Sequence, residues 1–308
     1  MKKAVIAGGS GTIGRCLIQE LKKHGYEVVV LTRGRQVEGA DKVVNWNGKD
    51  LGDWTSELEG ADAVINLSGS PVSVQWNEKN RKEIRHSRVQ PTEVVGKAIS
   101  QCKNPPRAWL NASATGWYGD SGVRQVTEAH EAGEGFLAEV CEAWERAVEA
   151  FATDHTRKII VRIGVVLGKN VPAYRKFAKI TKLGAGSAFG SGKQYMSWIH
   201  VEDLINMMMW AIESDFSGII NGTSPGAVSQ NEFMAEFRSA FSRPPVPNVP
   251  SFMVPMAAAI AGVDPEFLLT GTNVYPTIAL ARGFKFQYPT LKGTLESLVN
   301  TTPEAWKE

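Results

Sequence analysis

The chain has little cysteine. Cys16, Cys102 and Cys141 are its three cysteines among 308 residues. They are scattered and odd in number, and none has the spacing of a metal-ligand set. This usage argues against a disulfide framework and against a zinc site, and it favours a reducing compartment. We therefore expect a cytoplasmic protein that binds no metal.

An excess of charge of one sign is also missing, as are long apolar runs. The 34 Lys and Arg residues nearly balance the 32 Asp and Glu residues. This balance argues against nucleic acid or an anionic membrane surface as a partner. The apolar run at 252–263 is too short to span a bilayer and contains Pro255. With 43% hydrophobic and 21% charged residues, the composition is that of an ordinary globular protein.

Short apolar segments alternate with helical segments along the first two thirds of the chain. We predict strands at 4–8, 27–32, 42–46, 61–69, 107–113, 158–168 and 218–223. The helices between them include 12–24, 135–146 and a long one over about 77–101, which Pro91 is expected to kink. Apolar strands separated by helices indicate a parallel sheet covered on both faces.

The sequence therefore predicts an α/β fold with a Rossmann-type doubly wound parallel sheet. We assign residues 1–225 to this nucleotide-binding domain, with the segment at about 169–196 contributing to a second lobe. Residues 226–308 are expected to form a smaller C-terminal α/β lobe on the substrate side. The proline-rich link at 243–250 lies within it.

The strongest local signal is the glycine string between the first predicted strand and helix. Gly8, Gly11 and Gly14 form GxxGxxG, and Gly9 replaces Gly8 in an overlapping GxGxxG. Glycines permit a tight turn and close approach to a pyrophosphate, and the helix N-terminus offers free N–H groups. The alternative is a glycine-rich turn without a ligand. We predict dinucleotide binding by Gly8, Gly11, Thr12, Ile13 and Gly14.

The end of the second predicted strand reads LTRGR and holds no carboxylate. An acidic residue at this place binds the ribose 2′-hydroxyl of NAD. The chain has Thr32, Arg33 and Arg35 instead, and a guanidinium can pair with two phosphate oxygens at once. These residues favour NADP(H) over NAD(H), unless the arginines are merely solvated loop cations.

Together these segments resemble the extended short-chain dehydrogenases/reductases of the NAD(P)-dependent epimerase/dehydratase-like class. The matching segments are GGSGTIG, NLSG (66–69), SATGWYG (113–119) and WIHVEDL (198–204). More narrowly, the chain is similar to the branch labelled "epimerase family protein", whose C-terminal domain has no known function. That likeness rests on WNEKNRKEIRHSR (76–88), GVVLG (164–168), NGTSP (221–225) and GFKFQYP (283–289).

The resemblance implies further contacts to the cofactor. It places Arg88 against a phosphate and Glu83 against a ribose hydroxyl, although both residues could simply belong to an exposed charged helix face. It places Asn47 near the adenine amine and Val166 near the nicotinamide end. Leu67, Ser68 and Gly69 would flank the adenosine-side ribose.

The stretch GFLAEVCEAWER (135–146) lacks a pair of residues that the resemblance implies. Such enzymes carry Tyr-x-x-x-Lys on this helix, where the tyrosine exchanges the substrate proton and the lysine lowers its pKa. Leu137 and Cys141 stand at those two positions. The proton could come from Tyr118 with Ser113 as an orienting hydroxyl, or from Cys141, which we interpret as a packed apolar residue.

The third alternative is that the protein binds NADP(H) without fast hydride chemistry. The leading hypothesis is an NADP(H)-dependent oxidoreductase or epimerase-like protein acting on an unidentified small molecule. The alternative is a catalytically attenuated regulatory or sensor protein. His200 is interpreted as a core group, and Asp203 is expected to cap the helix that follows it. Fold analogy alone admits a homodimer.

Overall fold

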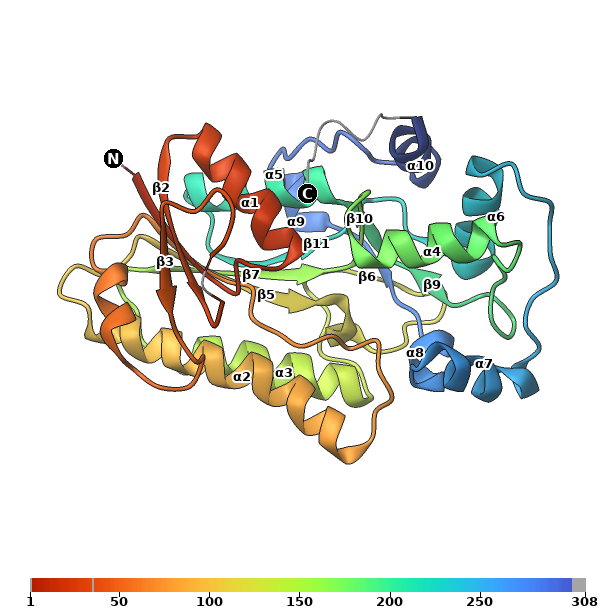
Figure 1. Ribbon diagram of the computed structural model, residues 1–308, viewed down its shortest axis with the longest axis horizontal. Helices are drawn as coiled ribbons and strands as arrows, with labels where there is room; N and C mark the ends of the chain where they lie inside the picture. The colour runs from red at the N-terminus through yellow and green to blue at the C-terminus, as the bar shows by residue number, and fades with distance from the viewer. Residues whose placement is uncertain (1, 35, 301–308) are drawn as a thin grey trace.

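The computed structural model describes residues 2–34 and 36–300, and a seven-stranded sheet runs through it (Figure 1). The strand order is β3-β2-β1-β4-β5-β7-β11, and all neighbouring strands are parallel. The strands are β1 (Lys2–Ala7), β2 (Tyr26–Thr32), β3 (Lys42–Asn45), β4 (Ala63–Asn66), β5 (Ala108–Ala114), β7 (Arg157–Ile163) and β11 (Gly218–Gly222). This order confirms the predicted doubly wound sheet.

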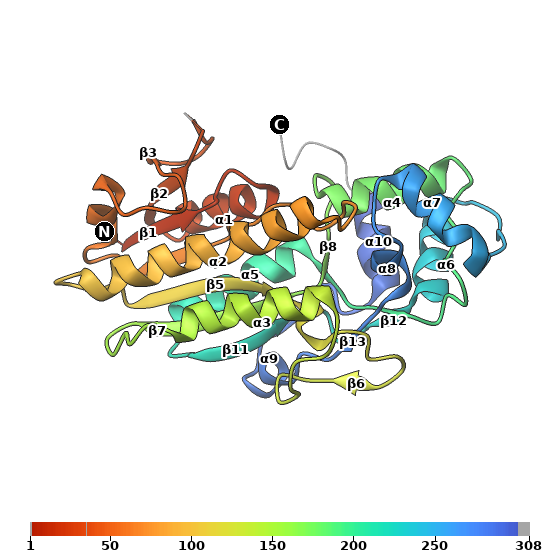
Figure 2. The same ribbon diagram turned by 90° about the horizontal axis from the view of Figure 1, so that it is seen from below.

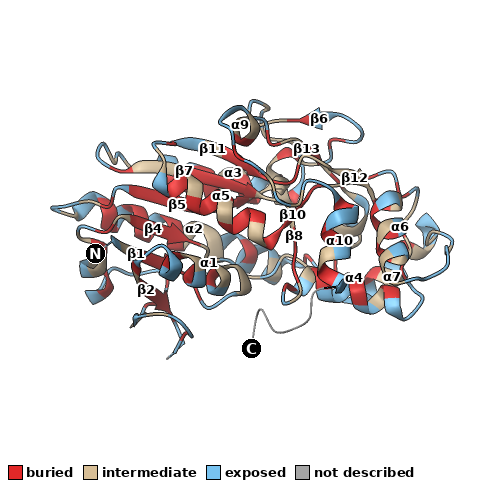
Figure 3. Ribbon diagram, turned by 90° about the horizontal axis from the view of Figure 1, so that it is seen from above, coloured by how far each residue is buried: buried red, intermediate tan, exposed pale blue. Residues whose placement is uncertain are grey.

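Helices cover both faces of the sheet. On one face lie α1 (Thr12–Lys23) and α5 (Val201–Glu213), and on the other lie α2 (Glu78–Gln101) and α3 (Phe136–Glu149) (Figures 1 and 2). Each face buries its own apolar cluster, so the central strands are mostly buried, whereas the edge strand β3 is partly exposed (Figure 3). The helix α2 continues through Pro91, and the short 3-10 helix η1 (Asp53–Leu58) packs Trp54 under the sheet.

A second lobe lies beyond the carboxyl ends of the strands (Figure 2). The helices α4 (Pro172–Lys182), α6 (Gln230–Ala240) and α10 (Leu291–Asn300) share a third apolar cluster. Two small strand pairs accompany them, β8 (Val165–Leu167) with β10 (Trp198–His200) and β9 (Tyr195–Met196) with β12 (Val228–Ser229). The remaining short helices are η3 (Ser251–Met253), α7 (Val254–Ala261), α8 (Pro265–Leu269) and α9 (Thr277–Ala281).

Residues 271–275 pair with the loop at 119–126, and we call this contact between distant segments the interlock. The strand β6 (Gln125–Val126) pairs in parallel with β13 (Asn273–Val274). The hydroxyl of Thr272 donates to the carbonyl oxygen of Gly119 at 2.7 Å, and Ser121 N–H donates to the carbonyl oxygen of Gly271. Several polar groups of the segment 119–126 therefore find their hydrogen-bond partners about 150 positions later in the chain.

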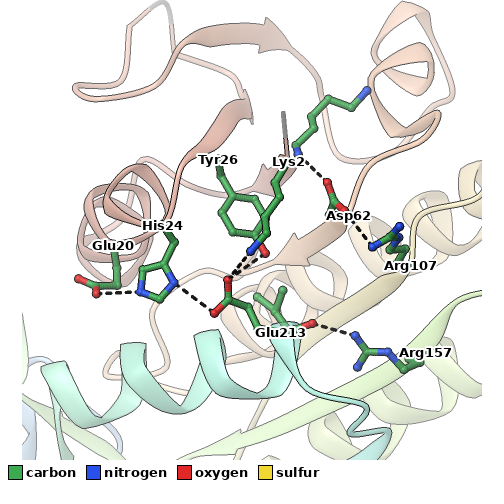
Figure 4. A network of polar contacts seen from close by, with 10 residues as sticks. Lys2, Glu20, His24, Tyr26, Asp62, Arg107, Arg157 and Glu213 are labelled. Atoms are coloured by element: carbon green, nitrogen blue, oxygen red, sulfur yellow. Dashed lines mark hydrogen bonds and ion pairs between the residues drawn. The ribbon is translucent and has the colours of Figure 1, made fainter.

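A polar cluster closes the opposite end of the sheet, at the amino ends of β1 and β2 (Figure 4). The carboxylate of Glu213, at the end of α5, accepts from Lys2 Nζ at 3.0 Å and contacts His24 Nδ1 at 3.1 Å. The hydroxyl of Tyr26 lies 3.4 Å from the same carboxylate. These partly exposed contacts tie α5 to β1 and β2, far from the glycine turn.

Candidate functional site

The glycine turn joins β1 to α1 at the point where the strand order reverses. Gly8 has a φ of +76°, and a Cβ on it would lie 3.0 Å from the Ser68 nitrogen. A Cβ on Gly14 would lie 2.4 Å from the Gly9 carbonyl oxygen. The first turn of α1 has no side-chain cap and no acidic residue, so its N–H groups are free for an anion. Thr12 and Ile13 begin this helix and are partly exposed.

Beside this turn lies the end of β2. Thr32 is buried, and its hydroxyl oxygen accepts from Gly34 N–H at 3.1 Å. Arg33 is exposed, and within the part of the chain that the structure describes no carboxylate forms an ion pair with it. Arg35 lies outside the described residues. Among the described residues at the end of β2, Arg33 is thus a guanidinium without a carboxylate partner, and none of these residues is acidic.

Asn47 lies after β3, and its side chain is occupied by its own turn. The amide oxygen accepts from the N–H groups of Lys49 and Asp50 at 2.9 and 3.0 Å. The amide nitrogen donates to the Asp50 carboxylate at 2.8 Å. Both hydrogen-bonding groups of the Asn47 amide are therefore already engaged within this turn. The predicted contact of Asn47 stays a prediction.

The loop after β4 is held by a buried amide. Asn66 Oδ1 accepts from Ser68 N–H at 3.1 Å, while its Nδ2 donates to Asn111 at 2.8 Å and to Thr92 at 3.0 Å. Trp144 of α3 donates to the same Thr92 hydroxyl at 2.9 Å. This network fixes Leu67 and Ser68 against Gly8, so the two predicted loops meet.

On α2, the two charged residues predicted to contact the cofactor differ in their surroundings. Glu83 is exposed to solvent. Arg88 is partly buried, and its Nη1 donates to the carbonyl oxygen of Ile84 at 2.9 Å. Its guanidinium lies under Gly69, where a Cβ would come within 3.2 Å of Cζ. The structure thus brings Arg88, but not Glu83, against the loop after β4.

Ser113 and Tyr118, the two candidate proton-handling residues, are both buried in a network of side chains. Tyr118 belongs to the 3-10 helix η2 (Thr115–Tyr118). Its hydroxyl donates to Asn221 Oδ1 at 2.7 Å and accepts from Arg162 Nη1 at 2.9 Å. The Ser113 hydroxyl donates to Glu145 at 2.5 Å. Burial raises the pKa of Tyr118 despite the neighbouring Arg162. Their catalytic role stays a prediction.

An ion pair between Glu145 of α3 and Arg162 of β7 forms the centre of this network. Two hydrogen bonds of 2.9 and 2.8 Å join the guanidinium to the carboxylate, and both side chains are almost fully buried. The Arg162 guanidinium also lies 3.9 Å from the centre of the Trp117 ring. Sequence reasoning missed this pair. A charged residue inside the apolar run KIIVRIG was the available signal, because such a charge needs a partner.

Leu137 and Cys141 of α3 line the other side of the η2 turn. Leu137 packs in an apolar cluster with Trp76 and Phe136, and Phe267 of α8 closes the cluster. The Cys141 thiol lies 3.7 Å from the carbonyl oxygen of Ala114. Burial, and secondly Glu145, raise the pKa of Cys141 to about 12. The thiol therefore stays protonated at neutral pH, as expected of a packed residue.

The strands β8 and β10 carry Val166 and His200. Val166 is buried beside Ile199 in the strand register. His200 is the N-cap of α5, and its Nδ1 accepts from Glu202 N–H at 3.2 Å. The prediction that Asp203 caps this helix is wrong. The Asp203 carboxylate is buried and instead accepts from the backbone N–H groups of Gln287 and Tyr288.

The burial of His200 makes the folded protein sensitive to acid. Its ring lies against Tyr288 with centroids 3.9 Å apart, and burial lowers its pKa to about 4. The unfolded chain takes up this proton near pH 6.5, so the stabilisation present above pH 6.5 is lost as pH falls toward 4. We expect a loss of about 3 kcal/mol in the free energy of unfolding. Urea unfolding at several pH values would measure it.

The control is His200→Asn, which replaces the Nδ1 acceptor of the N-cap with an amide oxygen and does not titrate. Its free energy of unfolding should fall less steeply between pH 6.5 and 4 than that of the wild type. Parallel curves for the two proteins would show that His200 contributes nothing to the acid sensitivity. The comparison also subtracts the contribution of Asp203, whose pKa is raised by burial.

The described residues, 2–34 and 36–300, hold neither a metal-ligand cluster nor a helix that could span a membrane. No group of three or more His, Cys, Asp or Glu side chains is arranged to hold a metal ion. No helix there combines the length and apolar character needed to cross a bilayer.

Comparison with family models gives two matches. Residues 4–222 match the model of the NAD dependent epimerase/dehydratase family. Residues 249–298 match a domain of unknown function. The first match covers all but the first two residues of the sheet, and it includes the glycine turn and the loop after β4.

Individual relatives extend the similarity over nearly the whole chain. An epimerase family protein SDR39U1 homolog of Arabidopsis chloroplasts is 34% identical, and the match covers 96% of this chain and 86% of the relative. The epimerase family protein ML0860 of Mycobacterium leprae is also 34% identical, with 98% and 97% covered. A crystal structure of human SDR39U1 with NADPH has a TM-score of 0.87 at 30% identity, covering 97% and 100%.

Proposed function

Because the chain belongs to the NAD dependent epimerase/dehydratase family, we propose that it binds NADP(H) along the carboxyl edge of the sheet. The observation that carries this proposal is the glycine turn. A Cβ at Gly8 would lie against the backbone of Leu67 and Ser68, and one at Gly14 against the backbone of Gly9. The turn is therefore as tightly packed as a pyrophosphate site requires, and the uncapped N-terminus of α1 faces the same turn. Similarity to the human protein crystallised with NADPH supports the same cofactor.

The choice of NADP(H) rests on the end of β2. A carboxylate there would repel a 2′-phosphate, whereas the exposed and unpaired Arg33 can donate two hydrogen bonds to it. Thr32 is buried and shapes the turn through Gly34. Arg33 is thus the residue we propose to distinguish the two cofactors.

We expect Arg33→Ala to lose the preference for NADPH. Loss of a charge-assisted hydrogen bond should weaken NADPH binding roughly 10- to 100-fold, while NADH binding stays nearly unchanged. Calorimetric titration of both nucleotides into wild type and variant measures this difference. Arg243→Ala is the matched control, because Arg243 is an exposed arginine after α6 in the other lobe.

Two results would contradict the cofactor assignment. Equal NADPH affinity of Arg33→Ala and wild type would exclude Arg33 as the 2′-phosphate ligand. A wild-type protein that binds neither nucleotide would exclude the proposed function itself.

For the reaction, we propose oxidoreductase or epimerase-like chemistry on an unidentified small molecule. The bound cofactor would supply the hydride chemistry. The chain would supply the substrate position beside η2, where Ser113 and Tyr118 are the candidate hydroxyl groups by motif. Tyr118→Phe removes the proposed proton donor. Any NADPH oxidation that the wild type shows in a screen of carbonyl compounds and sugar nucleotides should therefore be lost or slowed in this variant.

A second function, an NADP(H)-binding regulatory protein with little turnover, is favoured by the surroundings of α3. Leu137 sits in an apolar cluster, and Cys141 is buried with a raised pKa. Both hydroxyl candidates are engaged within the chain. Tight NADPH binding without oxidation by any compound of the screen would support this function over the enzyme.

We also propose a compartment and an oligomeric state for the protein. Three scattered cysteines without a disulfide support the reducing cytoplasm. A homodimer is proposed by analogy with the fold, and light scattering of the purified protein tests it.

A further inference from the structure

The short helix α8 lies in the segment that matches a domain of unknown function, and it contacts the loop after β4. This loop, residues 67–77, leads from β4 into α2. The N–H of Asp264, the N-cap of α8, donates to the carbonyl oxygen of Val74 at 3.1 Å. The Asp264 carboxylate accepts from Trp76 N–H at 3.3 Å. Two hydrogen bonds thus join the start of α8 to the second half of the loop.

An aromatic contact joins the same two segments. The Phe267 ring of α8 packs edge-on against the Trp76 ring, with centroids 6.3 Å apart. Trp76 also packs against Phe136, the first residue of α3, at 5.0 Å. Glu266 lies beside Gly135, where a Cβ would be 3.3 Å from the carboxylate Oε1. The helix α8 therefore contacts both the loop after β4 and the amino end of α3 (Figures 1 and 2).

The end of α8 is anchored in the second lobe. The carbonyl oxygen of Leu268 accepts from Gln194 Nε2 at 3.1 Å. The same amide donates to Gln230 Oε1 at 2.8 Å, and both glutamine side chains are buried. The first half of the loop lies at the glycine turn, where Ser68 meets Gly8. The helix α8 is thus a bridge between the second lobe and the loop that borders the proposed nucleotide site.

The contact of α8 with the loop is the weaker part of this bridge. Its two hydrogen bonds are 3.1 and 3.3 Å long, and the ring of Phe267 is only half-buried. No residue of α8 is fully buried. The first half of the loop, in contrast, is held by the buried amide of Asn66. Segments with few buried apolar contacts open locally at a low cost in free energy.

We propose that α8 holds the loop after β4 against the bound nucleotide, and that its detachment from this loop controls the release of NADP(H). This inference rests on the proposed function. Asp264 and Phe267 are positioning residues, because they act through Val74 and Trp76 rather than on the nucleotide. The C-terminal segment would then determine how long the cofactor stays bound.

The test measures NADPH release by stopped-flow fluorescence, with an excess of NADP⁺ as the displacing nucleotide. We expect Phe267→Ala to release NADPH at least about tenfold faster than wild type, without slower association. Asp264→Ala should act in the same direction. Asp264→Asn should recover most of the wild-type rate, because an amide oxygen can accept the same hydrogen bonds. Phe252→Ala is the matched control, because the Phe252 ring is 83% exposed in the same segment.

Amide hydrogen exchange gives a second readout that needs no nucleotide. The amides of residues 72–77 should exchange faster in Phe267→Ala than in wild type, because the loop loses its contact with α8. The amides of β1 and β2 should exchange at the same rate in both proteins. A purely structural role of Phe267 would instead accelerate exchange in the sheet and in the loop together.

Three results would overturn the inference. Equal release rates of NADPH from wild type and Phe267→Ala would show that α8 does not control release. Unchanged exchange of residues 72–77 would show that α8 does not hold the loop. Faster exchange of β1 and β2 as well would assign Phe267 to the stability of the fold. A wild type that binds no NADPH removes the proposed function, whereas the exchange of the loop still decides whether α8 holds it.

Discussion

Arg162→Met is expected to lower the free energy of unfolding by about 3–5 kcal/mol, because it leaves the Glu145 carboxylate buried without its cation. Tyr118 loses the donor to its hydroxyl oxygen in the same variant, and Trp117 loses the guanidinium stacked on its ring. Urea unfolding followed by circular dichroism measures the change.

The surface pair of Arg146 with Glu142 provides the matched control. In each pair an arginine contacts a glutamate of α3, but the side chain of Arg146 is mostly exposed. Arg146→Met should therefore lower the free energy of unfolding by less than about 1 kcal/mol. Replacing both buried partners, in Glu145→Met with Arg162→Met, should recover part of the loss. Equal small effects of Arg162→Met and Arg146→Met would show that the buried pair contributes little.

Gly14→Ala is expected to disrupt the glycine turn. The added Cβ would lie 2.4 Å from the Gly9 carbonyl oxygen and 2.6 Å from its Cα, and these backbone atoms cannot move without displacing the turn. Overpacking of this kind costs about 1–3 kcal/mol. Because the displaced atoms belong to the proposed pyrophosphate site, NADPH binding should be lost together with the stability. Calorimetry and urea unfolding measure the two effects.

Gly11→Ala is the control for Gly14→Ala. It tests whether the loss comes from the steric collision at Gly14 or from any side chain in the glycine turn. At Gly11 the added Cβ would meet one atom, the Gly8 carbonyl oxygen at 3.8 Å, and φ is −74°. The free energy of unfolding should therefore change by less than about 1 kcal/mol. A fall as large as that of Gly14→Ala would contradict the steric argument.

The sheet could be predicted from the sequence because its central strands are buried on both faces. Positions 28–31 and 63–65 form uninterrupted apolar runs, so each strand could be recognised without knowing which strand pairs with it. The pairing of β6 with β13 could not be predicted in the same way. Each strand has two residues, and their partners lie almost 150 positions apart. Short segments of this kind carry no periodicity.

Two parts of the candidate site, the glycine turn and the loop after β4, could be selected from the sequence because their glycines and small residues are visible there. The structure places Gly8 against Ser68, a contact that the sequence did not predict. The side-chain hydrogen-bond networks could not be predicted from the sequence. Ser113 and Tyr118 were selected for their hydroxyl groups, but the sequence did not reveal that Glu145, Arg162 and Asn221 engage them. Asp203 was misassigned because its partners, Gln287 and Tyr288, lie in a distant segment.

The interlock of residues 119–126 with 271–275 constrains the order in which the chain can fold during synthesis. The ribosome releases the N-terminal strands first. Until residue 275 emerges, Asn221 lacks the Tyr275 carbonyl oxygen, and the backbone of Gly119 and Ser121 lacks its partners. The sheet can assemble while the loop beside η2 remains open. A nascent chain cut short before position 271 would therefore be a substrate for chaperones and proteases, rather than a free-standing nucleotide-binding module.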